Sequence, residues 1–166
     1  PNDEINLKIE TVSKDNINSI FKKYNVPYEF DLLSVDIDSF DYWVTKEILT
    51  QYSPRVVMVE VNVRFEPTES WRLKDDPNWD WNGTKWYGAS PMAYKKMFND
   101  AGYTPVYTHV DDLIAVRNDV LKENGFSEPE WNYVYPHSNV PLYSTHNMGG
   151  TQELVTELNL DEWEEV

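Results

Sequence analysis

The N-terminal part of the chain shows two regular patterns of apolar residues. Residues 5–11 alternate between apolar and polar side chains, which predicts a strand with one buried face. Residues 13–26 carry apolar side chains three and four positions apart, which predicts a helix with one apolar stripe. Ser13 is the expected cap of this helix, and Pro27 follows its end.

Two nearly continuous apolar runs follow. Residues 30–37 and 55–61 are apolar at most positions, which is typical of parallel strands covered on both faces. The segment between them predicts a helix that Ser39 or Asp41 caps and that ends before Pro54.

A segment without a regular hydrophobic pattern follows the second apolar run. Residues 66–87 are rich in Trp, Pro, Asp and Asn without a steady period, which predicts a long functional loop. We assign residues 1–126 to one α/β domain that includes this loop. Residues 127–166 are assigned to a C-terminal extension packing on that domain, with a short helix at 152–158.

The third helix has clear start and stop signals. Ser90 and Pro91 form an N-cap and first-turn pair, and Gly102 closes the helix. Residues 103–109 and 113–117 then predict two short strands in an antiparallel hairpin.

This order of elements predicts a three-layer, Rossmann-like α/β fold. Its sheet is expected to be mainly parallel, with about five strands and a C-terminal antiparallel hairpin. A right-handed crossover places the strand at 5–11 beside the strand at 30–37. If this contraction of the sheet does not occur, the apolar run at 30–37 becomes an edge, and we expect a homodimer to cover it.

Charge and composition restrict the partners. The 166 residues include 14 Lys and Arg against 29 Asp and Glu, giving a net charge of −15 and a pI near 4.4. Such a chain repels phosphate backbones and anionic lipid, so neither nucleic acid nor a membrane is an expected partner. There is no cysteine, which excludes disulfides and thiolate chemistry. The chain has no signal-peptide pattern and no long apolar span, so we expect a cytoplasmic protein.

Acidic residues gather where the two buried strands end. Asp36 and Asp38 leave the first strand, and Glu60 and Asn62 leave the second. Since neighbouring strands lie about 4.8 Å apart, these oxygen ligands are predicted to converge. Carboxylate and amide oxygens suit Mg²⁺ or Mn²⁺. The alternative is that these acids only solvate strand ends and cap a helix.

Four segments resemble the C-terminal half of class I S-adenosylmethionine-dependent methyltransferases, particularly the FkbM-like group. They are FDLLSVDIDSFDYWV, RVVMVEVN, WYGASPMAYKKMFNDAGY and DLIAVRNDV. The resemblance covers about residues 5–120, and its most specific parts are DIDSFDYW and VEVN.

The resemblance implies methyl transfer from S-adenosylmethionine to a hydroxyl-type group of a small-molecule or carbohydrate acceptor. Asp36 would lie beside the methionine end of the cofactor. By analogy with cation-dependent relatives, Asp36, Glu60 and Asn62 would hold the metal ion. Asp38 or Glu60 would accept the acceptor's proton.

The chain also departs from the family. The family binds its cofactor with a Gly-rich turn after its first strand, but the first glycine here is Gly83. Ser39 stands where relatives often carry glycine. We therefore expect either a remnant of a longer enzyme or a natural short homologue, and we do not expect this chain alone to methylate a substrate.

Two other functions use the same residues. Asp36 and Asp38 also resemble the DxD motif of glycosyltransferases, where carboxylates hold the Mn²⁺ of a nucleotide-sugar. A non-catalytic interaction module is the third possibility. The tryptophans at 79, 81 and 86 are candidates for a substrate surface, and core packing is the alternative. His109, His137 and His146 have no metal-ligand spacing.

Overall fold

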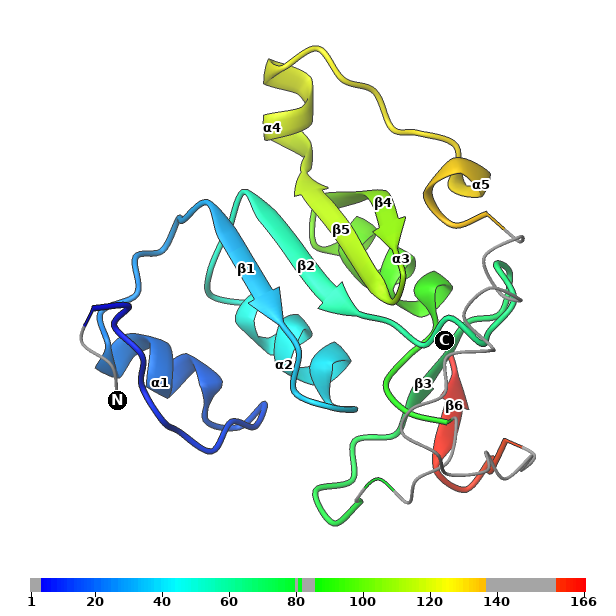
Figure 1. Ribbon diagram of the computed structural model, residues 1–166, viewed down its shortest axis with the longest axis horizontal. Helices are drawn as coiled ribbons and strands as arrows, with labels where there is room; N and C mark the ends of the chain where they lie inside the picture. Colours follow the sequence, from blue (N-terminus) through cyan, green and yellow to red (C-terminus); the bar gives the residue numbers. More distant parts are fainter. Residues whose placement is uncertain (1–3, 80, 82–85, 137–157) are drawn as a thin grey trace.

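The computed structural model describes residues 4–79, 81, 86–136 and 158–166 (Figure 1). In chain order the elements are α1 (Ile17–Lys23), β1 (Leu32–Val35), α2 (Asp41–Ile48), β2 (Val56–Glu60), β3 (Trp71–Leu73), α3 (Pro91–Asp100), β4 (Tyr103–His109), β5 (Asp112–Arg117), α4 (Asn118–Glu123), α5 (Trp131–Val134) and β6 (Trp163–Glu165). The protein is therefore of mixed α/β class, as the sequence predicts.

The main sheet has four strands in the order β1-β2-β5-β4. Strands β1 and β2 are parallel, and β5 is antiparallel to both β2 and β4. Three strands thus run in one direction and β5 runs against them. The hairpin predicted at 103–117 is present, with a register shift between Pro105 and Tyr107.

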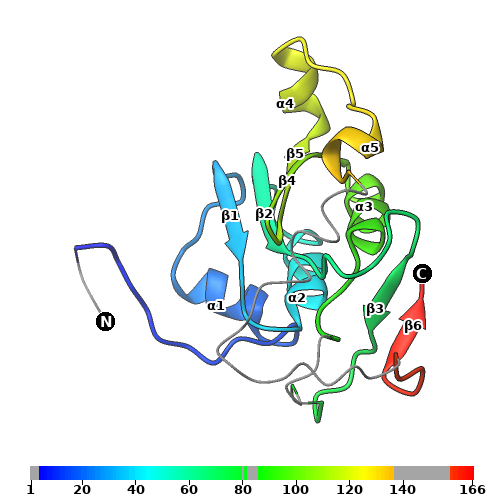
Figure 2. The same cartoon turned by 45° about the vertical axis from the view of Figure 1, so that its right-hand side comes forward.

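The two faces of this sheet have different surroundings. One face is buried in two rows across the strands, which are Leu33, Val57 and Ala115, and Val35, Val59 and Leu113. Helices α2 and α3 lie against this face (Figures 1 and 2). The opposite face, here called the exposed face, carries the rows Leu32, Val56 and Val116, and Ser34, Met58, Ile114 and Tyr107. Helix α4 lies beside the exposed face at Val116, and no described helix covers the rest of this face, so the three-layer prediction is not met there.

The predicted fifth strand is wrong. Residues 5–11 form no extended strand, and Ile5 and Ile9 are 70% and 76% exposed. The alternation at these positions is real, but no described strand of the sheet pairs with them. Strand β1 consequently stands at the edge of the sheet, because the described part of the chain supplies no strand beyond it.

Helix α3 confirms its sequence signals, whereas the caps predicted for the other helices are wrong. Ser90 Oγ accepts a hydrogen bond from the Ala93 N–H at 3.2 Å, and Pro91 is the first helical residue. The residue at the N-cap of α1 is Asn16, and that of α2 is Phe40; neither makes a side-chain capping bond.

The Trp-rich segment contains a strand, which the sequence did not indicate. Strand β3 pairs antiparallel with β6 near the C-terminus. Together they enclose a second apolar cluster around Phe65, Leu73 and Trp163. The C-terminal residues therefore pack on the N-terminal part through β6, while the proposed boundary near residue 126 stays a prediction.

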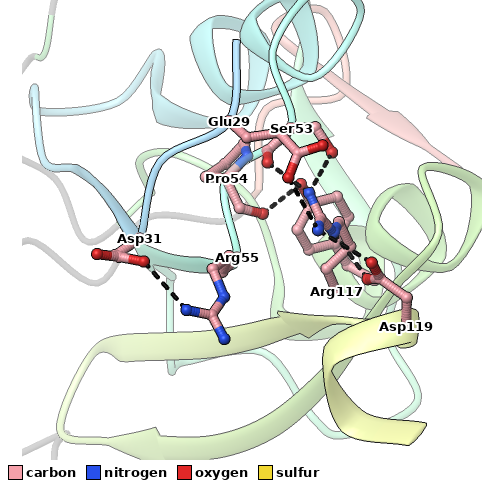
Figure 3. Close-up of polar contacts among 8 residues, drawn as sticks. Glu29, Asp31, Ser53, Pro54, Arg55, Arg117 and Asp119 are labelled. Atoms are coloured by element: carbon pink, nitrogen blue, oxygen red, sulfur yellow. Dashed lines mark hydrogen bonds and ion pairs between the residues drawn. The ribbon is translucent and has the colours of Figure 1, made fainter. Parts of the chain in front are cut away.

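Arg117 ties together the segments at the opposite end of the sheet (Figure 3). Its guanidinium donates to the carboxylate of Asp119, to Glu29 and to both the carbonyl and hydroxyl oxygens of Ser53. Tyr103 adds a hydrogen bond of 2.7 Å to the carbonyl oxygen of Pro54. This cluster fixes the entry to β2 against the end of β5.

Some predictions fall outside the described residues. They are residues 152–157 of the helix predicted at 152–158, and the two histidines His137 and His146. No helix in the described ranges is both long enough and apolar enough to cross a membrane.

Candidate functional site

The candidate site lies where the parallel strands β1 and β2 end. Val35 pairs with Val59 in the parallel register. The next residues, Asp36 after β1 and Glu60 at the end of β2, therefore lie side by side. Glu60 pairs on its other side with Asp112 of β5. The carboxyl ends of adjacent parallel strands thus bring acids from separate parts of the chain to one place.

Three carboxylates meet there, as the sequence predicts. One oxygen each of Asp36, Asp38 and Glu60 lies within 4.8 Å of the others. We call these three residues the acidic rim. Asp36 and Asp38 are exposed and Glu60 is half-buried, so a ligand can approach from solvent. This set of oxygen atoms is of the type that binds a hard divalent cation.

An unusual turn aims the first two of these acids. Asp38 and Ser39 both have positive φ, at 55° and 93°. A residue with a side chain adopts this conformation only at a cost, and glycine adopts it freely. Asp41 stabilises the turn because its Oδ1 accepts a hydrogen bond from the Ile37 N–H at 2.9 Å.

The crowding of acids changes their proton affinity. Burial, then the charges of Asp41 and Asp36, raise the pKa of Glu60 to about 8. Burial is also the main cause that raises the pKa of Asp41 to about 6, against the effect of its backbone hydrogen bonds. The pKa of Asp112 is raised as well, mainly by burial and by Asp111. Negative charge at this rim is therefore unfavourable unless a proton or a cation balances it.

Buried polar groups lie behind the acidic rim. Asp41 is only 1% exposed. The hydroxyls of Thr45 and Tyr94 are buried, and neither has a hydrogen-bond partner among the described residues. Burial and the charges of Asp41 and Glu60 hold the pKa of Tyr94 well above its usual value, so its hydroxyl is a neutral donor. The sequence did not single out Tyr94, because its spacing in α3 is that of a core residue.

Asn62, the fourth predicted ligand, is fully buried and used in the fold. Its Nδ2 donates to the carbonyl oxygen of Tyr87 at 3.0 Å, and its Oδ1 accepts from the Arg64 N–H at 3.1 Å. These bonds attach the segment before α3 to the end of β2. We therefore do not place Asn62 in the acidic rim.

The three candidate tryptophans have different surroundings. Trp86 packs on Phe65 in the second apolar cluster, with ring centroids 5.3 Å apart. Trp79 packs edge-on against Phe40, which follows the rim turn, with centroids 5.9 Å apart. Trp81 is 46% exposed. Trp79 therefore contacts Phe40, which follows Asp38 by two residues.

His109 pairs with Asp112 in the sheet. Asp112 in turn pairs with Glu60 of the acidic rim. The His109 side chain is exposed, and it is not part of the three-carboxylate cluster. Glu60, Asp112 and His109 thus form a row across the exposed face, at the end of the sheet where β2 ends.

Comparisons of the chain with protein-family models, with curated proteins and with solved structures found no match. The function is therefore inferred from the site alone.

Proposed function

We propose that the chain carries the cation-binding and acceptor side of a methyltransferase-like site, located at the acidic rim. The observation that carries this proposal is the convergence of Asp36, Asp38 and Glu60 within 4.8 Å at the ends of two parallel strands. Mg²⁺ or Mn²⁺ would bind these oxygens, and a hydroxyl-type acceptor would bind beside the cation.

The backbone of the rim turn supports a methyltransferase-like origin. In the FkbM-like group, relatives often carry glycine where this chain has Ser39. Ser39 has φ of 93°, a conformation that favours glycine. The early start of α2, at Asp41, and the terminal β4–β5 hairpin agree with the layout that the resemblance implies.

The raised proton affinity of Glu60 supports a cation at the rim. At neutral pH Glu60 retains a proton because burial and neighbouring acids disfavour its charge. A divalent cation held by these oxygens would balance their negative charge and would favour the ionised form of Glu60. Once ionised, Glu60 or Asp38 is placed to accept the proton of an acceptor hydroxyl, while Asp36 orients the ligand.

The described residues show no Gly-rich turn of the kind with which the family binds S-adenosylmethionine. The resemblance assigns only Asp36 to that cofactor, and no glycine precedes Gly83 for a Gly-rich turn. We therefore assign no step to the cofactor on this chain, and we expect the 166-residue chain not to bind it with saturation.

Titration calorimetry with MnCl₂ and MgCl₂ tests the proposal. We expect one saturable divalent cation per chain at pH near 8, with proton release that differs between buffers of different ionisation heat. Asp36→Asn and Glu60→Gln should each weaken binding at least about tenfold, since each removes a charged ligand. Glu123→Gln, at an exposed position of α4, is the matched control.

Added ligands then distinguish the function classes. Tight binding of a nucleotide-sugar that requires Mn²⁺ would favour the DxD glycosyltransferase alternative. Absence of cation binding would refute both enzyme proposals and favour the interaction module. Saturable binding of S-adenosylmethionine would show that our expectation about the cofactor is wrong.

A further inference from the structure

A cavity whose charge is opposite to that of the acidic rim lies between α2, α3 and β3. Its volume is about 420 Å³. The lining residues come from α2 and the two residues after it, from β3, from the second half of α3 and the residue after it, and from the C-terminal residue: Tyr42, Lys46, Leu49, Thr50, Arg72, Lys96, Met97, Asp100, Ala101 and Val166. It shares no residue with the acidic rim.

Three cations line this cavity, although the chain as a whole carries a net charge of −15. They are Lys46, Arg72 and Lys96, and Asp100 is the only carboxylate side chain among the lining residues. Arg72 is ion-paired with Glu164, so the two lysines are the cations of this lining that would attract an anion to the cavity.

Arg72 is held in place by the fold. Its Nε donates to Glu164 at 2.8 Å and its Nη1 donates to the Tyr42 hydroxyl at 2.9 Å. Its Cζ lies 4.4 Å from the centroid of the Trp43 ring, and its side chain is only 15% exposed. Its Nη2 has no hydrogen-bond partner in the described ranges. A preorganised guanidinium whose Nη2 is still able to donate can bind one phosphate or carboxylate oxygen.

The two lysines at this cavity have different partners. Lys46 contacts the Trp43 ring, at 5.5 Å from its centroid, and has no carboxylate partner among the described residues. Lys96 donates a hydrogen bond to the main-chain oxygen of Val166, the last residue of the sequence. Both are exposed on the surface, so they stand at the opening of the cavity while Tyr42 and Arg72 form its interior.

The rest of the lining is apolar. The side chains of Leu49 and Met97, with the ring of Tyr42, provide contact surface for carbon atoms. We propose that this cavity binds a small organic anion, which is a molecule with an apolar body and one phosphate or carboxylate group. Arg72, Lys46 and Lys96 bind the anionic group, and the apolar lining contacts the body.

Amide NMR titration with phenyl phosphate tests this site, with phenol as the neutral analogue. We expect saturable shift changes in the last turns of α2 and α3 with phenyl phosphate. Phenol should bind at least about fivefold more weakly, because it lacks the charge. Higher salt should weaken the binding of phenyl phosphate and leave phenol unchanged.

Variants identify the residues. Lys46→Met and Lys96→Met keep the aliphatic stem and should each weaken phenyl phosphate binding by about fivefold. Lys122→Met, in α4 and outside the cavity, is the matched control and should change nothing. The amide spectrum of each variant verifies its fold. Equal affinity for phenol and phenyl phosphate, wild-type affinity in both cavity variants, or no saturable shift would overturn the proposal.

Discussion

Glu60 shows how a single residue acquires its chemistry from its surroundings. In sequence it is an ordinary acid at the end of an apolar run. In the fold it lies on the exposed face, next to Asp36 and opposite Asp112. Burial, then the charges of Asp41 and Asp36, raise its pKa to about 8.

The raised pKa predicts a dependence of stability on pH. The unfolded chain ionises Glu60 near 4.5 and the folded chain near 8, so between these values the folded state binds the extra proton. The free energy of unfolding therefore falls as pH rises, by at most about 1.4 kcal/mol per pH unit, reduced by solvent screening of this half-buried group. The contribution is complete below about pH 4.5 and is lost through pH 8.

Urea unfolding across this range measures the effect. Glu60→Gln should flatten the decline of the unfolding free energy between pH 6 and pH 8. This window lies above the pKa of Asp41, which is about 6. Glu123→Gln should follow the wild type. Parallel profiles for Glu60→Gln and wild type would contradict the raised pKa.

At the same scale, the sequence foresaw part of the site. The convergence of Asp36, Asp38 and Glu60 was predictable because adjacent parallel strands end at the same edge of a sheet. The participation of Asn62 was not confirmed by its placement, because its amide is bonded to the backbone of the following loop. The position of the buried Tyr94 hydroxyl behind the acidic rim was not foreseen, because it depends on how α3 packs on the sheet.

Among the elements, α3 has the most complete sequence signal. Ser90 Oγ caps the helix through the Ala93 N–H, and it also accepts from the Trp71 N–H at 2.9 Å. One buried hydroxyl thus joins α3 to β3.

Ser90→Ala should lower the free energy of unfolding by about 2 kcal/mol, because it removes a helix cap and leaves a buried N–H without its acceptor. Ser19→Ala, at an exposed position of α1, should change it by less than about 0.5 kcal/mol. Chemical unfolding monitored by circular dichroism measures both. Equal stability of the two variants would refute this role of Ser90.

Two elements show the limits of local patterns. Residues 5–11 alternate as a strand would, but alternation provides no partner, and no described strand of the main sheet pairs with them. Strand β3 is three residues long inside an irregular segment, and it exists because β6, some ninety positions later, pairs with it. Pairing between distant segments is invisible to a local period.

At the scale of the whole molecule, β1 is an edge strand beside an uncovered apolar face. Leu32 is 58% exposed, and Met58 and Ile114 lie next to each other on the same face. The Val56 N–H donates to the carbonyl oxygen of Asp31, so the N–H groups of Leu33 and Val35 face β2 and that of Ser34 points away from it. Because an unpaired strand edge can pair with another chain, we still expect a homodimer that covers β1.

Light scattering after size exclusion tests the homodimer. We expect a mass above 19.6 kDa that increases with concentration. Ser34→Pro removes the outward N–H without removing a bond to β2, and it should restore the monomer. Ser34→Ala, which keeps that N–H, should associate like the wild type. A wild-type protein that stays monomeric at all concentrations would contradict the prediction.

The sequence by itself determined the α/β class, the two parallel strands, the capped third helix, the terminal hairpin and the acids at the strand ends. These features depend on residues close together in the chain, where hydrophobic period and capping chemistry act locally. Only the tertiary structure decided the number of strands, the β3–β6 pair, the exposed face and the cationic cavity. Each of these depends on which distant segments share a surface, and burial there, rather than any local preference, sets pairing and proton affinity.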